Sequence, residues 1–102
     1  MEALVKFYEK EMETLKEAYA KYVESNKKIH GLALALRQIK NEGDTSVAEA
    51  ESVLNCALCR ERKFNESMSD RCYSLKAFVR RIELELEVNG YEANQVEELF
   101  GY

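Results

Sequence analysis

The sequence predicts an all-α protein: a long antiparallel helical hairpin at about 2–41 and 46–88, followed by a short C-terminal helix at about 92–100. Three observations lead to this prediction. The 102 residues include no proline and only four glycines, so little in the chain breaks a helix. One turn signal, Asn41-Glu42-Gly43-Asp44-Thr45, stands near the middle. On each side of it, apolar residues recur at alternating spacings of three and four.

Those apolar positions define a seam along each predicted helix. A rhythm of three and four places side chains on one stripe of an α-helix, the stripe that two packed helices share. Polar residues take three of the positions: Asn26 in the first stretch, Glu61 and Asn65 in the second. The apolar members are Tyr8, Met12, Leu15, Tyr19, Tyr22, Ile29, Ala33 and Leu36, then Leu54, Leu58, Met68, Cys72, Leu75, Val79, Ile82 and Leu86.

Start and stop signals bound each element. Gly43 suits the left-handed residue that closes the first helix. Ser46, with Glu49 three residues later, forms a capping box for the second. The Asn89-Gly90 pair ends that helix at Val88. In the third helix the apolar residues expected to pack back on the hairpin are Val96, Leu99 and Phe100.

A turn centred near residues 43–44 sets the expected register. It places Asn26 opposite Glu61, with Asn65 one turn away, so that polar seam residues meet in a polar waist. The alternative is that both helices break there, near residues 25–31 and 65–70, and give four shorter helices in a compact bundle.

The length of the hairpin bears on assembly. Forty helical residues span about 60 Å, and two such rods in contact along one stripe have a thin core. Burial of the off-seam apolar residues would remove them from water. We therefore expect a homodimer forming a four-helix bundle, or a higher oligomer, and an unidentified protein partner. The candidate partner-binding residues are Phe7, Val23, Leu34, Phe78 and Val88.

The composition indicates a single helical domain that spans residues 1–102. The net charge of −4 is uneven: residues 52–81 hold seven Lys/Arg and three Asp/Glu, whereas residues 82–102 hold six Glu and no base. Nucleic-acid binding is not expected of an acidic chain. The sequence has no apolar run of membrane-spanning length and no secretion signal, so we expect a cytoplasmic protein with reduced thiols and no membrane association.

A metal site is the first chemical candidate. His30, Cys56 and Cys59 are the residues that could converge, because the register brings His30 near residue 57. Structural zinc needs four tetrahedral ligands, and Cys72 is about 20 Å from Cys59 along a continuous helix. The sequence therefore favours small buried thiols, with no metal and no cofactor.

A basic level of the hairpin is the second candidate. Five cations there could bind a phosphate, a nucleotide or an acidic peptide. Glu24, Glu61 and Glu66 lie in the same zone and favour a solvated charged face instead. The five candidate anion-binding residues are Lys27, Lys28, Arg60, Arg62 and Lys63.

Catalytic patterns are missing from the sequence. The four glycines are scattered rather than grouped in a phosphate loop, and the single histidine excludes a His-rich metal centre. Glu83, Glu85 and Glu87 alternate by two and are expected to mark a solvated helix end. The sequence thus favours a non-enzymatic interaction or assembly protein of the adaptor or inhibitor type. The alternative is a helical oligomer that binds or sequesters an anionic small molecule such as a nucleotide.

Overall fold

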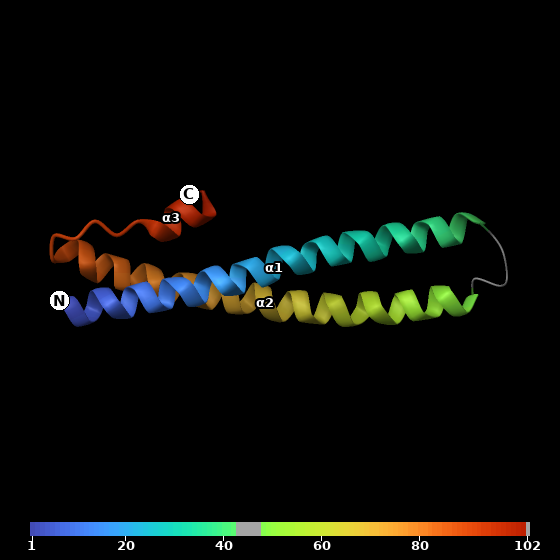
Figure 1. Ribbon diagram of the computed structural model, residues 1–102, viewed down its shortest axis with the longest axis horizontal. Coiled ribbons are helices and arrows are strands. Elements are labelled where there is room, and N and C mark those ends of the chain that lie inside the picture. Colours follow the sequence, from blue (N-terminus) through green and yellow to red (C-terminus); the bar gives the residue numbers. More distant parts are fainter. Residues whose placement is uncertain (43–47, 102) are drawn as a thin grey trace.

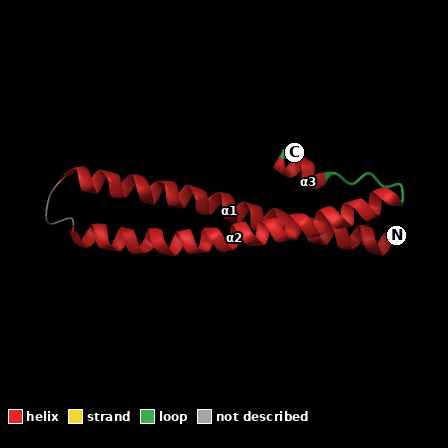
Figure 2. Ribbon diagram, turned by 180° about the vertical axis from the view of Figure 1, so that it is seen from behind, coloured by secondary structure: helices red, strands yellow, loops and turns green. Residues whose placement is uncertain are grey.

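The computed structural model describes residues 1–42 and 48–101 and shows a helical hairpin with a short third helix. Helix α1 spans Glu2–Glu42, α2 spans Ala48–Val88 and α3 spans Gln95–Phe100. The two long helices run antiparallel, and α3 folds back beside them at the end that holds the N-terminus (Figure 1). The view from behind shows the same arrangement, with no strand in the described ranges (Figure 2). The predicted all-α hairpin is confirmed.

Both long helices are continuous over 41 residues each. The alternative with breaks near residues 25–31 and 65–70 is therefore wrong. The absence of proline explains the continuity, because no residue in either helix lacks a backbone N–H. The resulting rod measures 66 × 20 × 14 Å along its principal axes. The predicted roles of Gly43 and of the Ser46–Glu49 capping box lie partly or wholly outside the described residues.

The register differs from the predicted one by about one helical turn. The Asn65 side-chain amide donates to the Asn26 carbonyl oxygen at 2.8 Å, so Asn26 pairs with Asn65 rather than with Glu61. The difference arises because α1 continues to Glu42 and α2 begins only at Ala48, which moves the turn further along the chain. A polar waist is present, but with a different pairing.

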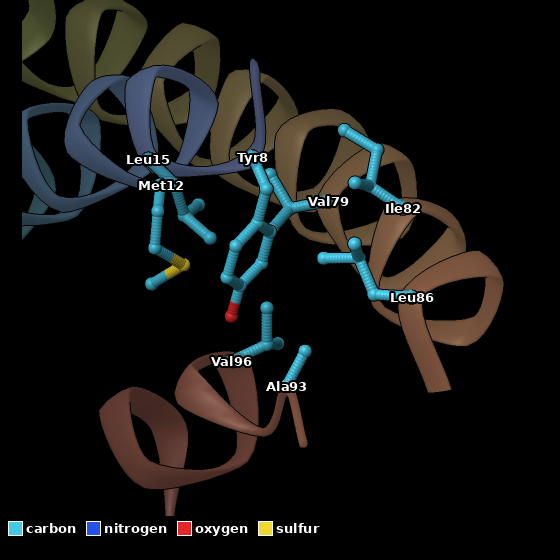
Figure 3. Close-up of a cluster of buried hydrophobic side chains, with 8 residues drawn as sticks. All are labelled: Tyr8, Met12, Leu15, Val79, Ile82, Leu86, Ala93 and Val96. Carbon is cyan, nitrogen blue, oxygen red and sulfur yellow. The ribbon is translucent and has the colours of Figure 1, made fainter. Parts of the chain in front are cut away.

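The core is concentrated at the end of the rod that contains α3. Tyr8, Met12 and Leu15 of α1 point toward the Ala93 and Val96 side chains, beside residues of α2 (Figure 3). Between the polar waist and the turn, the buried apolar residues in the described part of the chain are Leu36 and Leu58. The buried cluster consists of Tyr8, Met12, Leu15, Val79, Ile82, Leu86, Ala93 and Val96.

The reversal between α2 and α3 depends on Gly90. Its φ of +86° lies in the left-handed region, which strains other residues. The Tyr91 N–H donates to the Leu86 carbonyl and the Gly90 N–H to the Glu87 carbonyl, the two bonds of a Schellman motif. This turn directs the chain back along the hairpin, and α3 begins at Gln95, three residues later than predicted.

Replacement of Gly90 by alanine is expected to lower the free energy of unfolding by about 1–2 kcal/mol, because a Cβ disfavours the left-handed conformation. Gly31→Ala is the matched control. Gly31 lies within α1, its φ is not positive, and a Cβ there meets no atom within 4 Å. That change should raise the free energy of unfolding by about 1 kcal/mol. Urea unfolding of dilute protein measures both, and equal effects would contradict the assignment.

Candidate functional site

Two of the five predicted partner-binding residues meet in the structure. The Phe7 ring of α1 and the Phe78 ring of α2 lie edge to face, with centroids 5.9 Å apart. Each side chain is still 43% exposed. Leu34 and Val88 are also exposed, Val88 at 83%, whereas Val23 is half-buried. Leu34, Val23 and Val88 are not part of the Phe7–Phe78 pair.

Helix geometry places this pair on the side of the hairpin away from α3. Phe78 directly precedes the seam residue Val79, whereas Arg80 directly follows it. Residues before and after a seam position lie on opposite flanks of a helix. Arg80 and Val96 line the groove between α2 and α3. The flank that carries Phe7 and Phe78 is therefore left uncovered.

A series of residues continues this uncovered flank toward the turn. Residues seven apart keep to one side of helices that pack in a seven-residue rhythm. Phe64 lies 14 residues before Phe78, and Lys21 and Lys28 lie 14 and 21 residues after Phe7. Two adjoining grooves, which share Lys28 and Glu61, follow the same flank. We call this the open face and define it by Phe7, Lys21, Ser25, Lys28, Gly31, Ala57, Arg60, Phe64 and Phe78.

Phe64 is a functional candidate that was not among the predicted partner-binding residues. It is 45% exposed and lines the groove with Ser25 and Glu61. The sequence could have identified Phe64 in the same way as Phe78, because each directly precedes a seam position. Tyr73, Leu84 and Val53 are exposed as well and were not among the predicted partner-binding residues.

The grooves of the open face contain buried polar atoms without partners. Ser25 is 1% exposed, and its hydroxyl oxygen has no hydrogen bond to any described residue. The same holds for Glu61 Oε1, which is buried in the same groove. An unsatisfied buried polar atom is costly, by about 1–3 kcal/mol. The hairpin therefore carries this energetic cost beneath the open face.

The five predicted anion-binding cations do not form one site. Lys28 and Arg60 line a groove of the open face, with Gly31, Leu32 and Ala57. Arg62 lines a different groove, together with Arg37 and Lys40. Lys27 and Lys63 are exposed and line neither groove. Arg60 and Arg62 separate because they lie before and after the seam position of Glu61.

The predicted metal candidates are not brought together. His30, Cys56 and Cys59 are all exposed, and no group of three or more His, Cys, Asp or Glu side chains among the described residues is placed to hold a metal ion. The prediction of buried thiols is wrong for Cys56 and Cys59 and confirmed for Cys72. Burial raises the pKa of the Cys72 thiol. No helix in the described ranges is long and apolar enough to cross a membrane.

A buried carboxylate holds α3 against the hairpin. Glu83 is fully buried, which corrects its prediction as part of a solvated helix end. Its Oε2 accepts a 2.6 Å hydrogen bond from the Tyr8 hydroxyl and a 3.1 Å bond from the Val96 N–H of α3. Arg80 donates to Oε1 at 3.1 Å. The cap residue Asn94 makes no side-chain hydrogen bond to α3, so Glu83 satisfies an N–H that helix starts leave unpaired.

This cluster perturbs the pKa of Tyr8. Burial raises it above its ordinary value, and the hydrogen bond to Glu83 and the negative charge of Glu83 raise it further. The contacts with Glu83 and Glu87 raise the pKa of Arg80. Glu83 thus keeps Tyr8 protonated and Arg80 charged.

A loss of stability above about pH 10 follows from the raised pKa of Tyr8. In the unfolded chain tyrosine ionises near pH 10, whereas in the folded protein Tyr8 keeps its proton. The unfolded state then binds fewer protons, and stability falls by up to about 1.4 kcal/mol per pH unit. Urea unfolding below and above pH 10 should show this fall, and Tyr8→Phe should reduce its slope. An unchanged slope in Tyr8→Phe would contradict the assignment.

Comparison of the chain with protein-family models, with characterised proteins and with solved structures finds no match. The functional assignment therefore depends on the open face and on the Glu83 cluster.

Proposed function

We propose that the protein is a non-enzymatic helical interaction protein of the adaptor or inhibitor type, which binds a second copy of itself and a protein partner through its helix faces. The observation that carries this proposal is the open face. Phe7, Phe64 and Phe78 are each nearly half exposed there, on a flank that α3 does not cover.

The physical argument is the thinness of the core. A rod 14–20 Å across leaves much of its apolar surface in water. Burial of apolar surface contributes about 25 cal/mol per Å². Aromatic residues that a monomer leaves exposed on one face are typical of a surface that binds protein. A four-helix bundle made of two hairpins would bury this face.

The alternative function, binding of an anionic small molecule, has less support. It requires the five cations at the basic level to act together. Only Lys28 and Arg60 share a groove, and Arg62 belongs to another. The groove of Lys28 and Arg60 also includes Glu61, whose charge opposes an anion.

Light scattering coupled to size-exclusion chromatography tests self-association. We expect a mass of at least twice the 11.8 kDa of the chain. Scattering is needed because a rod 66 Å long elutes earlier than a compact protein of equal mass. A mass of one chain at every concentration would refute self-association.

A further inference from the structure

The open face has two features that a single chain does not explain. One is the Phe7–Phe78 pair, which we call the knob. The other is the groove lined by Lys28, Gly31, Leu32, Ala57, Arg60 and Glu61, which we call the small-residue groove and whose volume is about 500 Å³. The knob lies toward the N-terminal end of α1 and the groove toward the turn, on the same flank of the hairpin.

Gly31 is the least expected residue of the small-residue groove. Glycine in a helix interior costs about 1 kcal/mol relative to alanine. Nothing in the described chain requires it, because a Cβ at Gly31 would meet no atom within 4 Å and its φ is not positive. A glycine is required where another chain approaches closely. With Ala57 across the groove, Gly31 leaves room for a large side chain.

One unpartnered polar atom, Ser25 Oγ, lies between the two features, and the other, Glu61 Oε1, belongs to the small-residue groove. Ser25 precedes Gly31 in α1, and its buried hydroxyl shares a groove with Glu61 Oε1 and Phe64. A second chain laid along the open face would pass over this point.

The charges decide the direction in which a second copy would lie. The knob is at the acidic end of the rod, where residues 82–102 hold six Glu and no base. Five of these Glu are exposed, and Glu83 is buried and paired with Arg80. Lys28 and Arg60 stand at the small-residue groove. Parallel packing would set acidic end against acidic end. Antiparallel packing sets the acidic end of each copy near the small-residue groove of the other, where Lys28 and Arg60 outnumber Glu61.

We propose that two copies pack antiparallel through their open faces, with the knob of each inserted into the small-residue groove of the other. A two-fold axis between the knob and the groove forms both contacts at once. The rotation that places the knob of one copy in the groove of the other also places the second knob in the first groove. The antiparallel dimer rests on the self-association of the proposed function, and it adds which surfaces of the two copies meet.

Two variants test the two patches separately. Phe78→Gln removes the knob, and Tyr73→Gln is its control, since Tyr73 lines the groove between α2 and α3. Gly31→Gln fills the small-residue groove, and His30→Gln is its control at the neighbouring exposed position. Gly31→Gln also improves helix propensity, so a loss of assembly there is not a loss of folding. Each patch variant should raise the dimer dissociation constant about tenfold or more, and the controls should leave it unchanged.

Mixing the two patch variants is the decisive experiment. A heterodimer of Phe78→Gln with Gly31→Gln keeps one intact contact, between the wild-type Phe78 of one chain and the wild-type groove of the other. Neither homodimer keeps any. Native mass spectrometry of the mixture should therefore show the heterodimer enriched over both homodimers. Enrichment supports the knob-in-groove pairing.

Other results would overturn the proposal in distinguishable ways. A monomeric wild-type chain would refute self-association itself. A wild-type dimer that both variants leave intact refutes the interface but not the proposed function. Weakened variants without heterodimer enrichment would mean that like patches face each other. A mass that keeps growing with concentration would mean an open head-to-tail chain rather than a closed dimer.

Discussion

Replacing Leu15 by alanine is expected to lower the free energy of unfolding by about 2–5 kcal/mol, the largest loss of any apolar truncation proposed for this chain. Leu15 is fully buried within the cluster where α1, α2 and α3 meet. Truncation removes apolar contacts and leaves a cavity, which rigid neighbours fill only in part. Urea unfolding followed by far-UV circular dichroism measures the change.

Leu84→Ala is the matched control for this prediction. Leu84 is 48% exposed on α2 and lies outside the buried cluster. Both changes replace leucine by alanine within a helix, so helix propensity cancels between them. The control should cost less than about 1 kcal/mol. Equal losses would show that the three-helix end is not the principal core.

The residues of this core could be predicted from the sequence. Tyr8, Met12, Leu15, Val79 and Leu86 all hold seam positions, and all are buried. Periodicity identifies them because a stripe shared by two helices is apolar whatever the details of the turn. The same reasoning set Phe7 and Phe78 off the seam, and the structure leaves both partly exposed.

The register could not be predicted in the same way. A slip of one helical turn moves every seam residue onto another seam position, so the periodic pattern is the same before and after. The pairing of Asn26 with Asn65 rather than Glu61 depends on where α1 ends and α2 begins. The turn signal placed those ends only within a few residues.

The separation of the cations has a related cause. Numbering along the hairpin placed Arg60 and Arg62 at one level, which is correct along the axis of the rod. It did not distinguish the two flanks, on which the residues before and after Glu61 lie. The burial of Glu83 required knowledge that α3 returns across α2 with a free N–H at Val96. A pattern within α2 alone carries no information about that.

Glu83→Ala is the second change with a large expected effect, a loss of about 2–6 kcal/mol in the free energy of unfolding, at about 1–3 kcal/mol for each buried donor left without a partner. It leaves the Tyr8 hydroxyl and the Val96 N–H buried without their acceptor. Tyr8→Phe should cost less, about 1.5–3 kcal/mol, because Glu83 keeps its bonds to Val96 and Arg80. Glu87→Ala is the control: the Glu87 side chain is partly exposed and, among the described residues, bonds to Arg80, so its loss should cost less than about 1 kcal/mol.

The double variant Tyr8→Phe/Glu83→Ala distinguishes a shared cluster from two independent contacts. If Glu83 is the common acceptor, Tyr8→Phe removes the hydroxyl that Glu83→Ala leaves without a partner. The loss of unfolding free energy in the double variant is then smaller than the sum of the two single losses, by about 0.5–3 kcal/mol. Hydrogen exchange should then show the α3 amides opening before those of α1, since Glu83 is the polar contact that ties Val96 to the hairpin. Strict additivity, with α3 still protected in Glu83→Ala, would mean that apolar packing of Ala93 and Val96 alone holds the third helix.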